Sequence, residues 1–261
     1  MRTFWAVYQR ELKSYFYSPI FYILAAVFLI VVGNTFKDAF IAFANQTMQI
    51  LVQVKNYQTE VPLMSVNSIA ARLSTLLNFN FLLIVPLLTM RIYAEEKKNG
   101  TMELLMTSPT TTTQVLFGKF LSCLTVYTVM MLLTVVFHVL IDFYSKGNLD
   151  WGPVWSGYLG SFLFGSTIIA IGMFFSSVTE NQIIAAALAL TFSTGLWMLI
   201  FTTALLSYPL NVAIMYFSPS DHIDSFIDGF IGIKHIVYFL TMTSFWLVLT
   251  GISVESARWR Q

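Results

Sequence analysis

The residues best suited to chemistry lie between 94 and 109, and the chemistry that they indicate is binding rather than catalysis. The sequence there reads Ala-Glu-Glu-Lys-Lys-Asn-Gly-Thr-Met-Glu-Leu-Leu-Met-Thr-Ser-Pro. Asn99-Gly100 is a turn signal, because glycine adopts the positive φ that ends many helices. Thr101 is placed to cap a new short helix, and Ser108-Pro109 is placed to close it. The pattern predicts a small helical knob between two longer elements.

The predicted knob exposes apolar side chains between charged flanks. Glu103 lies near its positive N-terminal end, where a carboxylate is favoured. Apolar groups that project into water need a protein to cover them, so the knob is predicted to be a docking surface for another protein. A solvated helix end at the lipid headgroups is the alternative explanation for the charged run that precedes it. The exposed apolar residues are Met102, Leu104, Leu105 and Met106, and the charged run is Glu95, Glu96, Lys97 and Lys98.

No catalytic motif accompanies this segment. A phosphate-binding loop needs G-x-x-x-x-G-K-[ST], and the only Gly-Lys pair, Gly118-Lys119, has Thr113 and Phe120 at the other two positions. The sequence also lacks G-x-S-x-G and H-E-x-x-H. We therefore expect a chain that is not an enzyme and binds no cofactor itself. The 12 Met residues are scattered and predict packing rather than copper transport.

Two ionisable residues at membrane depth are a weaker candidate site. His138 and Asp142 are four residues apart, so a helix places them on one face. We expect a local hydrogen-bonded pair, with a proton relay or a metal site as the alternative.

The composition indicates a membrane protein. Of 261 residues, 57% are hydrophobic and only 10% are charged, and about 20 apolar residues form a helix that spans the roughly 30 Å hydrocarbon layer. The net charge of +1 argues against a nucleic-acid partner. We predict a single all-α polytopic membrane domain over 1–261. Its six transmembrane helices are expected at 19–36, 73–93, 115–141, 154–177, 181–206 and 234–254, each built around a window without charge.

Segments outside these spans have patterns of their own. Residues 1–18 have aromatic residues on one side and Arg2, Arg10 and Lys13 on the other, which predicts an amphipathic helix lying flat at the headgroups. The loop 94–114 ends in Thr111-x-x-Gln114, a capping box for the third span. In the turn before the fifth span, Thr179 is expected to cap that helix, with Glu180 beside it.

The segment 208–232 is expected to form a re-entrant or interfacial hairpin on the outer side. Ser218-Pro219 begins a short helix, since serine caps helices and proline suits the first turn. Asp221, Asp224 and Asp228 share one face of that helix. We expect a solvated face there, with binding of cations or of a partner as the alternative.

Small residues inside two of the spans predict close helix contacts. In lipid, helices associate where small side chains let their backbones approach. Gly157, Ser161 and Gly165 recur at four-residue spacing in the fourth span, and the fifth span has the similar series Ala185, Ala189 and Ser193. We expect both stripes to face neighbouring helices.

The distribution of Lys and Arg predicts the orientation. These residues resist translocation, and with a cytoplasmic N-terminus nine of them lie inside and five outside, while all six Asp lie outside. Both termini are therefore expected in the cytoplasm. Phe36, Phe40 and Phe43 indicate that the first helix continues beyond the bilayer into the outer segment from Lys37 to Arg72.

The segment 94–109 resembles the cytoplasmic-loop signature of the ABC-2 type transporter permeases, in which acidic-acidic-basic residues precede G-T-x-E-x-L-x-x-x-P. The opening Gln9-Arg10-Glu11-Leu12-Lys13-Ser14-Tyr15-Phe16-Tyr17-Ser18-Pro19 is similar to the start of the branch that contains gliding-motility permeases and the permease for nitrous-oxide-reductase maturation. The resemblance implies an elbow helix over 1–18 and a coupling helix that docks on a separate ATPase subunit. It assigns Arg10, Glu11 and Lys13 to the elbow, and Glu95, Glu96, Lys97, Gly100, Thr101, Glu103, Leu104, Leu105, Met106, Ser108 and Pro109 to the coupling segment, with Thr179 and Glu180 in a smaller second coupling turn.

The resemblance also implies a function. The chain is expected to be a permease of the cytoplasmic (inner) membrane that exports or translocates an unidentified substrate. Two copies of an ABC ATPase subunit would bind ATP and Mg, and a second permease copy or a paralogue would complete the pathway. The alternative is a non-transporting subunit that relays ATPase motion to an extracytoplasmic partner, for which the long outer segment offers surface.

Overall fold

The fold is a bundle of long helices. The computed structural model describes residues 2–57, 66–101, 111–203 and 206–258, and no β-strand occurs in these ranges. The helices are α1 (Arg2–Tyr17), α2 (Pro19–Tyr57), α3 (Val66–Thr89), α4 (Arg91–Lys98), α6 (Thr112–Leu133), α7 (Val135–Tyr144), α8 (Trp151–Val178), α9 (Gln182–Thr202), α10 (Leu210–Phe217), α11 (Pro219–Ile227) and α12 (Ile233–Arg258).

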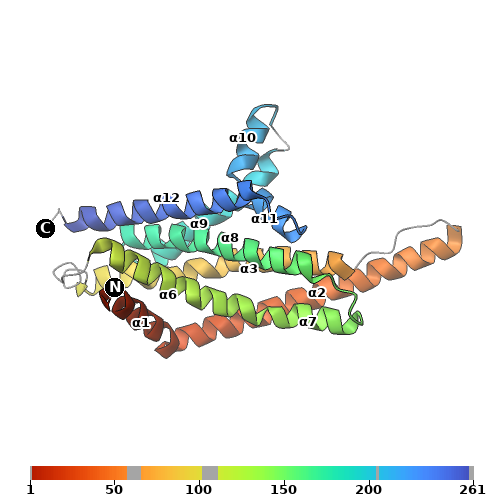
Figure 1. Ribbon diagram of the computed structural model, residues 1–261, viewed down its shortest axis with the longest axis horizontal. Helices are drawn as coiled ribbons and strands as arrows, with labels where there is room; N and C mark the ends of the chain where they lie inside the picture. The colour runs from red at the N-terminus through yellow and green to blue at the C-terminus, as the bar shows by residue number, and fades with distance from the viewer. Residues whose placement is uncertain (1, 58–65, 102–110, 204–205, 259–261) are drawn as a thin grey trace.

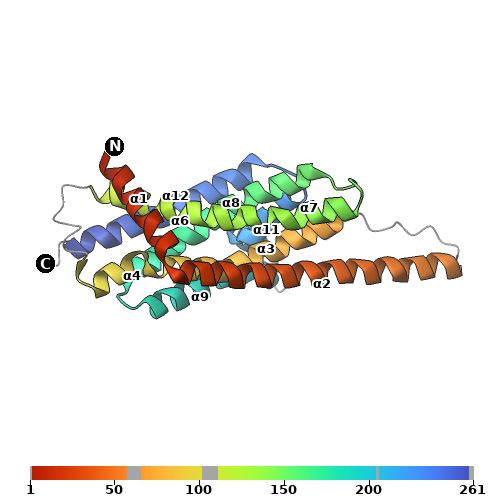
Figure 2. The ribbon, with the colours of Figure 1, turned by 90° about the horizontal axis from the view of Figure 1, so that it is seen from below.

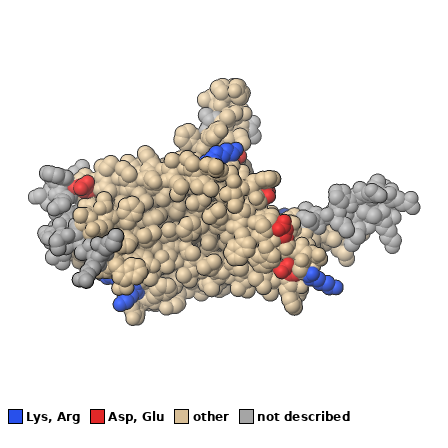
Figure 3. All heavy atoms as spheres, viewed as in Figure 1, with Lys and Arg blue, Asp and Glu red and all other residues tan. Residues whose placement is uncertain are grey.

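Six candidate membrane spans are present among the described residues, which confirms the predicted all-helical class and the number of spans. They cover 21–49, 66–98, 112–144, 151–178, 182–202 and 233–256. The helices run along one long axis (Figure 1). On the face shown in Figure 3, charged side chains lie toward the two ends of the bundle and at the base of the α10 projection, and a broad uncharged belt lies between them. We call the end where α1 begins and α12 ends the terminal end.

Helix α8 is the centre of the bundle. It packs against α3, α4, α6, α9, α11 and α12, and small residues make that close packing possible. A Cβ added at Gly165 would lie 2.2 Å from the ring of Tyr127, and one added at Gly172 would lie 2.0 Å from the Thr89 hydroxyl. The predicted stripe in the fourth span therefore faces neighbouring helices. The series in α9 is buried as well, since Ala185, Ala189 and Ser193 are at most 1% exposed.

Two of the predicted spans are divided next to a threonine, and the first of them also contains Pro86, which cannot donate to the helix ladder. The predicted helix 73–93 is divided into α3 and α4, and Thr89, the last residue of α3, donates from its hydroxyl to the carbonyls of Val85 and Pro86. Thr134 lies between α6 and α7, within the predicted span 115–141, and bonds back to Met131 O at 2.6 Å. Such back-bonding competes with the regular ladder and bends helices.

Helix α2 extends past the rest of the bundle (Figure 2). Its 39 residues make it about 58 Å long, well beyond the predicted end at residue 36. The helix therefore continues past Phe36, Phe40 and Phe43 without a break, and its extension beyond the bilayer stays a prediction. Phe36 packs on Phe137 of α7, with ring centroids 5.3 Å apart, and the Phe40 ring lies 6.3 Å from that of Tyr144. Phe43 also packs against the core, so the bundle supports α2 at least to this residue.

The predicted outer hairpin contains two short helices. Helix α10 projects sideways from the bundle (Figure 1). Helix α11 begins with Ser218 at its N-cap and Pro219 in its first turn, although the serine hydroxyl makes no capping bond. Ile223 and Phe226 are fully buried, whereas Asp224 and Asp228 are exposed. One face of α11 is thus apolar and buried and the other is acidic and exposed, as the sequence predicted.

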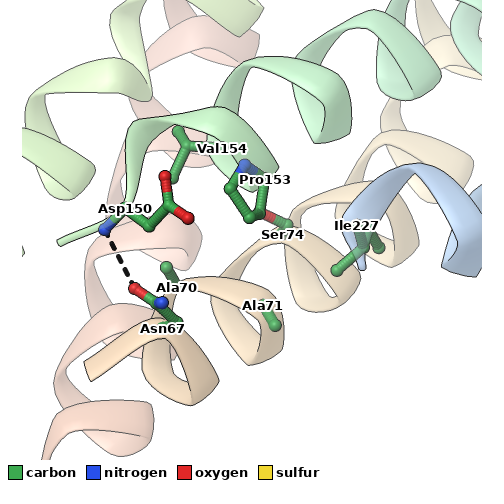
Figure 4. Close-up of a pocket in the computed structure, with 8 residues that line it drawn as sticks. All are labelled: Asn67, Ala70, Ala71, Ser74, Asp150, Pro153, Val154 and Ile227. Carbon is green, nitrogen blue, oxygen red and sulfur yellow. Dashed lines mark hydrogen bonds between the residues drawn. The ribbon is translucent and has the colours of Figure 1, made fainter. Parts of the chain in front are cut away.

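A small pocket lies between α3 and α8 at the end opposite the terminal end (Figure 4). Its empty volume is about 200 Å³. The backbone N–H of Asp150 donates to the Asn67 side-chain oxygen across 3.0 Å, and Asp150 caps α8 by accepting from Gly152 N. These bonds fasten the start of α8 to the start of α3.

The contact between α6 and α8 can be tested with one methyl group. We expect Gly165→Ala to lower the free energy of unfolding by about 1 to 3 kcal/mol, because the new Cβ overlaps the buried ring of Tyr127. Thermal unfolding of the purified protein in detergent measures the effect. Gly195→Ala in α9 is the matched control, since no atom lies within 4 Å of its added Cβ. Equal stability of the two variants would contradict the packing role of Gly165.

Candidate functional site

Four charged side chains, one of them a buried lysine, meet at the terminal end. Lys119 of α6 has a side chain that is 1% exposed. Its ammonium lies 2.8 Å from Glu96 Oε1 of α4 and 3.4 Å from Glu11 Oε1 of α1. It also donates to the carbonyl of Ile92 across 2.8 Å. We call Arg10, Glu11, Glu96 and Lys119 the Lys119 cluster; it joins three helices.

Arg10 completes the charge balance of the cluster. Its Nη2 lies 2.7 Å from Glu11 Oε1 and 3.3 Å from Glu96 Oε1, so two cations face two carboxylates. Burial alone raises the pKa of Glu11, but the charges of Lys119 and Arg10 outweigh that effect and hold it below its ordinary value. Glu11 is therefore ionised at neutral pH, and the buried ammonium has the partners that a buried charge requires.

A second set of contacts fastens α4 to the end of α8. The Ser176 hydroxyl accepts from the backbone N–H groups of Tyr93 and Ala94, each at 3.1 Å, and donates to Met90 O. The Lys97 ammonium donates to the carbonyl of Ser177. One serine thus satisfies backbone groups at the start of α4, where a helix leaves its N–H groups unpaired.

The junction of α1 and α2 is held against the same region. The Tyr15 hydroxyl donates to Leu88 O across 3.0 Å, and Arg91 donates to Ser18 Oγ across 3.1 Å. The Arg91 guanidinium also lies over the Tyr15 ring, 4.6 Å from its centroid. Farther along α1, a Cβ added at Gly118 of α6 would meet Val7 at 2.9 Å, so α1 packs closely on α6.

The structure brings only some of the expected site residues together. Arg10, Glu11 and Glu96 meet in the Lys119 cluster, and Lys97 contacts α8. The exposed residues Lys13 and Glu95 lie outside these contacts. Gly100 has φ +68°, as expected of a turn glycine, and the Thr101 hydroxyl donates back to Glu96 O. The remaining residues of the predicted knob, namely Met102, Glu103, Leu104, Leu105, Met106, Ser108 and Pro109, lie outside the described residues.

The caps predicted for α6 and α9 have different outcomes. Thr111 is the N-cap of α6 and accepts from Gln114 N, which confirms that capping signal. Thr179 does not cap α9. Asn181 does so, because it lies directly before the first helical residue and accepts from Ile183 and Ile184 N. Thr179 accepts from Asn181 N instead, and Glu180 is exposed.

The expected pairing of His138 with Asp142 is wrong. His138 points into the bundle, where its ring nitrogens lie 3.4 Å from Ser74 Oγ and 3.1 Å from the Tyr158 hydroxyl. Asp142 accepts from Leu149 N and from the Trp151 indole N–H, each at 3.4 Å. The two side chains share a helix face, but each bonds to partners on other elements and not to the other. Among the described residues, no group of three or more His, Cys, Asp or Glu is arranged to hold a metal ion.

Lys119 and Ser176 are the site residues that the motifs did not indicate. Lys119 had a detectable signal, since it is the single charge at the edge of the uncharged window 120–141. A cation at that depth needs a carboxylate. Its partners are 23 and 108 residues away in the sequence, so only the tertiary structure identifies them. Ser176 had no signal, because serines are common in this part of the chain.

The fold and the site together define a multi-pass helical membrane protein with a tightly fastened terminal end. The model of the ABC-2 family transporter protein matches residues 5–255. The chain therefore belongs to the ABC-2 transporter family and is a permease of an ABC transporter. Such a permease is a non-catalytic transmembrane subunit, and its family implies an ABC ATPase partner. A comparison with curated proteins found no match.

The contribution of the Lys119 cluster to stability can be tested by substitution. Lys119→Ala leaves Glu11 and Glu96 without their buried cation, so we expect the free energy of unfolding to fall by about 3 to 5 kcal/mol. Adding Glu96→Gln should recover part of the loss, because it removes one uncompensated carboxylate. Unfolding of the purified protein in mixed micelles, followed by circular dichroism, measures both effects. Lys98→Ala, at an exposed position of α4, is the control, and a loss no larger than its own would refute the role of the cluster.

Proposed function

We propose that the chain is the permease subunit of an ATP-driven ABC transporter that exports or translocates an unidentified substrate across the cytoplasmic membrane. A separate ATPase subunit binds ATP and Mg and supplies the energy. The observation that carries the proposal is the family match, which extends over residues 5–255. The six spans, long enough to cross a bilayer, support it.

In this proposal the terminal end faces the cytoplasm. The basic residues Arg10, Lys97 and Lys98 belong to α1 and α4 at that end, whereas Asp142 and Asp150 lie by the turn between α7 and α8 at the other. Basic residues favour the cytoplasmic side. Both termini and the segment between α4 and α6 are then accessible to a cytoplasmic ATPase.

The coupling surface is proposed to be the segment 94–114, with the elbow helix α1 and the turn at Thr179 and Glu180 beside it. A subunit that docks on this segment pushes on the end of α4 and the start of α6. The Lys119 cluster ties both to α1, and Ser176 ties α4 to α8. Movement of the loop is therefore passed to several helices as a unit. Docking shifts the bundle only by the difference in its affinity for the two states.

The assembly is proposed to contain two permease subunits and two ATPase subunits. The second permease is another copy of this chain or a paralogue. Within the family, the opening 9–19 supports placement in the branch of gliding-motility and nitrous-oxide-reductase-maturation permeases.

A second candidate function rests on the length of α2. This helix reaches Tyr57 and extends past the other helices (Figure 2), so it offers surface outside the bilayer. A protein on the outer side that engaged this extension could receive ATPase motion without any transport of substrate. The chain would then be a mechanotransmission subunit.

The coupling proposal is tested by the ATPase activity of the assembled complex. We expect Leu105→Asp or Glu103→Lys to abolish the stimulation of ATP hydrolysis by the permease, because each change disrupts the face proposed to contact the ATPase. Membrane insertion should be unchanged. Glu255→Lys is the matched charge reversal, since Glu255 is exposed near the end of α12 and outside the loop. Full stimulation with Leu105→Asp would count against the coupling segment.

The orientation is tested by thiol labelling in a Cys123→Ala background. Cys123 is the only cysteine and is buried. We expect a membrane-impermeant maleimide to label Thr101→Cys only after the cells are permeabilised. It should label Asn148→Cys, which is exposed between α7 and α8, in intact cells. The reverse pattern would place the terminal end outside.

A further inference from the structure

A cleft opens beside the junction of α1 and α2, where three parts of the chain meet. It contains about 460 Å³ of empty space between that junction, the end of α3 with α4, and the first residue of α9. The part of it that is enclosed amounts to about 100 Å³, which is smaller than a typical small-molecule site, so the cleft accommodates part of a larger molecule. Its lining is apolar apart from a few polar groups and consists of Tyr15, Phe21, Leu24, Leu87, Leu88, Met90, Arg91, Glu95 and Gln182.

Two opposite charges line the cleft without pairing with each other. Arg91 and Glu95 are one turn apart on α4, so they share a face. The ion pairs among the described residues include neither of them. Arg91 uses one nitrogen for Ser18 and its flat face for Tyr15. Its other N–H groups make no hydrogen bond to the described part of the chain, and they can still bind an anion.

The position of the cleft identifies its surroundings. Arg91 begins α4, the last part of the candidate span 66–98, and the charged residues Glu95, Glu96, Lys97 and Lys98 follow it there. We therefore place the charged part of the cleft near the headgroups and its apolar part toward the hydrocarbon. The apolar surface of the chain continues beside the cleft, because Tyr22 and Ile23 of α2 and Ile183 of α9 are 58%, 62% and 78% exposed. An apolar wall that ends in a charged rim matches the form of a phospholipid.

We propose that this cleft binds a phospholipid whose headgroup carries both a phosphate and a primary ammonium. Arg91 binds the phosphate, because a guanidinium presents a fork of donors that fits phosphate oxygens. Glu95 accepts from the ammonium, and the Gln182 amide adds a donor at the rim. The acyl chains lie along Phe21, Leu24 and Leu87. Glu95 disfavours a headgroup that has a phosphate and no ammonium, because its carboxylate then faces a second negative charge.

The proposal is tested by binding of lipid to the purified, delipidated full-length chain, followed by native mass spectrometry. The probes are dioleoyl phosphatidylethanolamine, dioleoyl phosphatidylglycerol and inorganic phosphate. We expect one phosphatidylethanolamine per chain, bound more tightly than phosphatidylglycerol and not displaced by inorganic phosphate. Equal affinity for the two lipids would overturn the proposal, and so would displacement by inorganic phosphate. No ATPase takes part in the measurement, so its result is independent of the coupling proposal.

Substitutions locate the binding. Glu95→Gln should weaken phosphatidylethanolamine about tenfold, as expected for loss of a charge-assisted hydrogen bond, and should leave phosphatidylglycerol unchanged or stronger. Glu180→Gln is the matched control, because Glu180 is an exposed glutamate near the start of α9 that does not line the cleft. Arg91→Gln should weaken both lipids. Because Arg91 also holds Ser18, the unfolding temperature of that variant is measured in parallel, and Glu95→Gln tests the site if Arg91→Gln does not fold. A loss with Glu95→Gln no greater than with Glu180→Gln would overturn the proposal.

Discussion

The terminal end depends on one constraint, which is that the Lys119 ammonium is buried and must be compensated. A charge taken out of water costs several kcal/mol unless carboxylates and carbonyls replace its hydration. Lys119 lies on α6, and its partners come from α1 and α4. Both helices must therefore dock on α6 in one register. The buried cation thus makes the contact between the helix ends specific. Arg10 supplies a second positive charge for the two carboxylates.

In the middle of the bundle, close approach of helix backbones fixes how the helices pack, as Lys119 does at the terminal end. Hydrophobic burial does not favour helix association inside lipid, so packing and hydrogen bonds must supply it. Gly165 lets Tyr127 lie against α8, and the hydroxyl of that tyrosine donates to Ser161 O across 2.7 Å. Gly172 lets Thr89 approach where α3 bends into α4. The direction in which α4 leaves α3, and hence the position of Glu96 below Lys119, is set partly by this glycine contact.

The fold class and the number of spans were predictable from sequence because the bilayer dictates both the length and the composition of each crossing. Local signals also worked where the partner was local, as at Thr111, which caps α6. They failed where a nearer or a more distant group competed. Asn181 and not Thr179 caps α9, and His138 bonds to Tyr158 and not to Asp142. The partners of Lys119 were beyond prediction, since one of the pairs joins residues that are 108 positions apart.

Rigid and adaptable parts of the terminal end lie on different faces of α4. One face carries Glu96, whose carboxylate is held by Lys119, and the backbone of its first turns is bound by Ser176. The other face carries Arg91 and Glu95 along an open cleft. A force on the segment after Gly100 reaches the first face through buried ionic contacts. On the second face, the exposed Glu95 carboxylate forms no ion pair among the described residues and can exchange contacts with lipid headgroups. The same eight-residue helix can therefore be fixed to its bundle and still respond to the lipid around it.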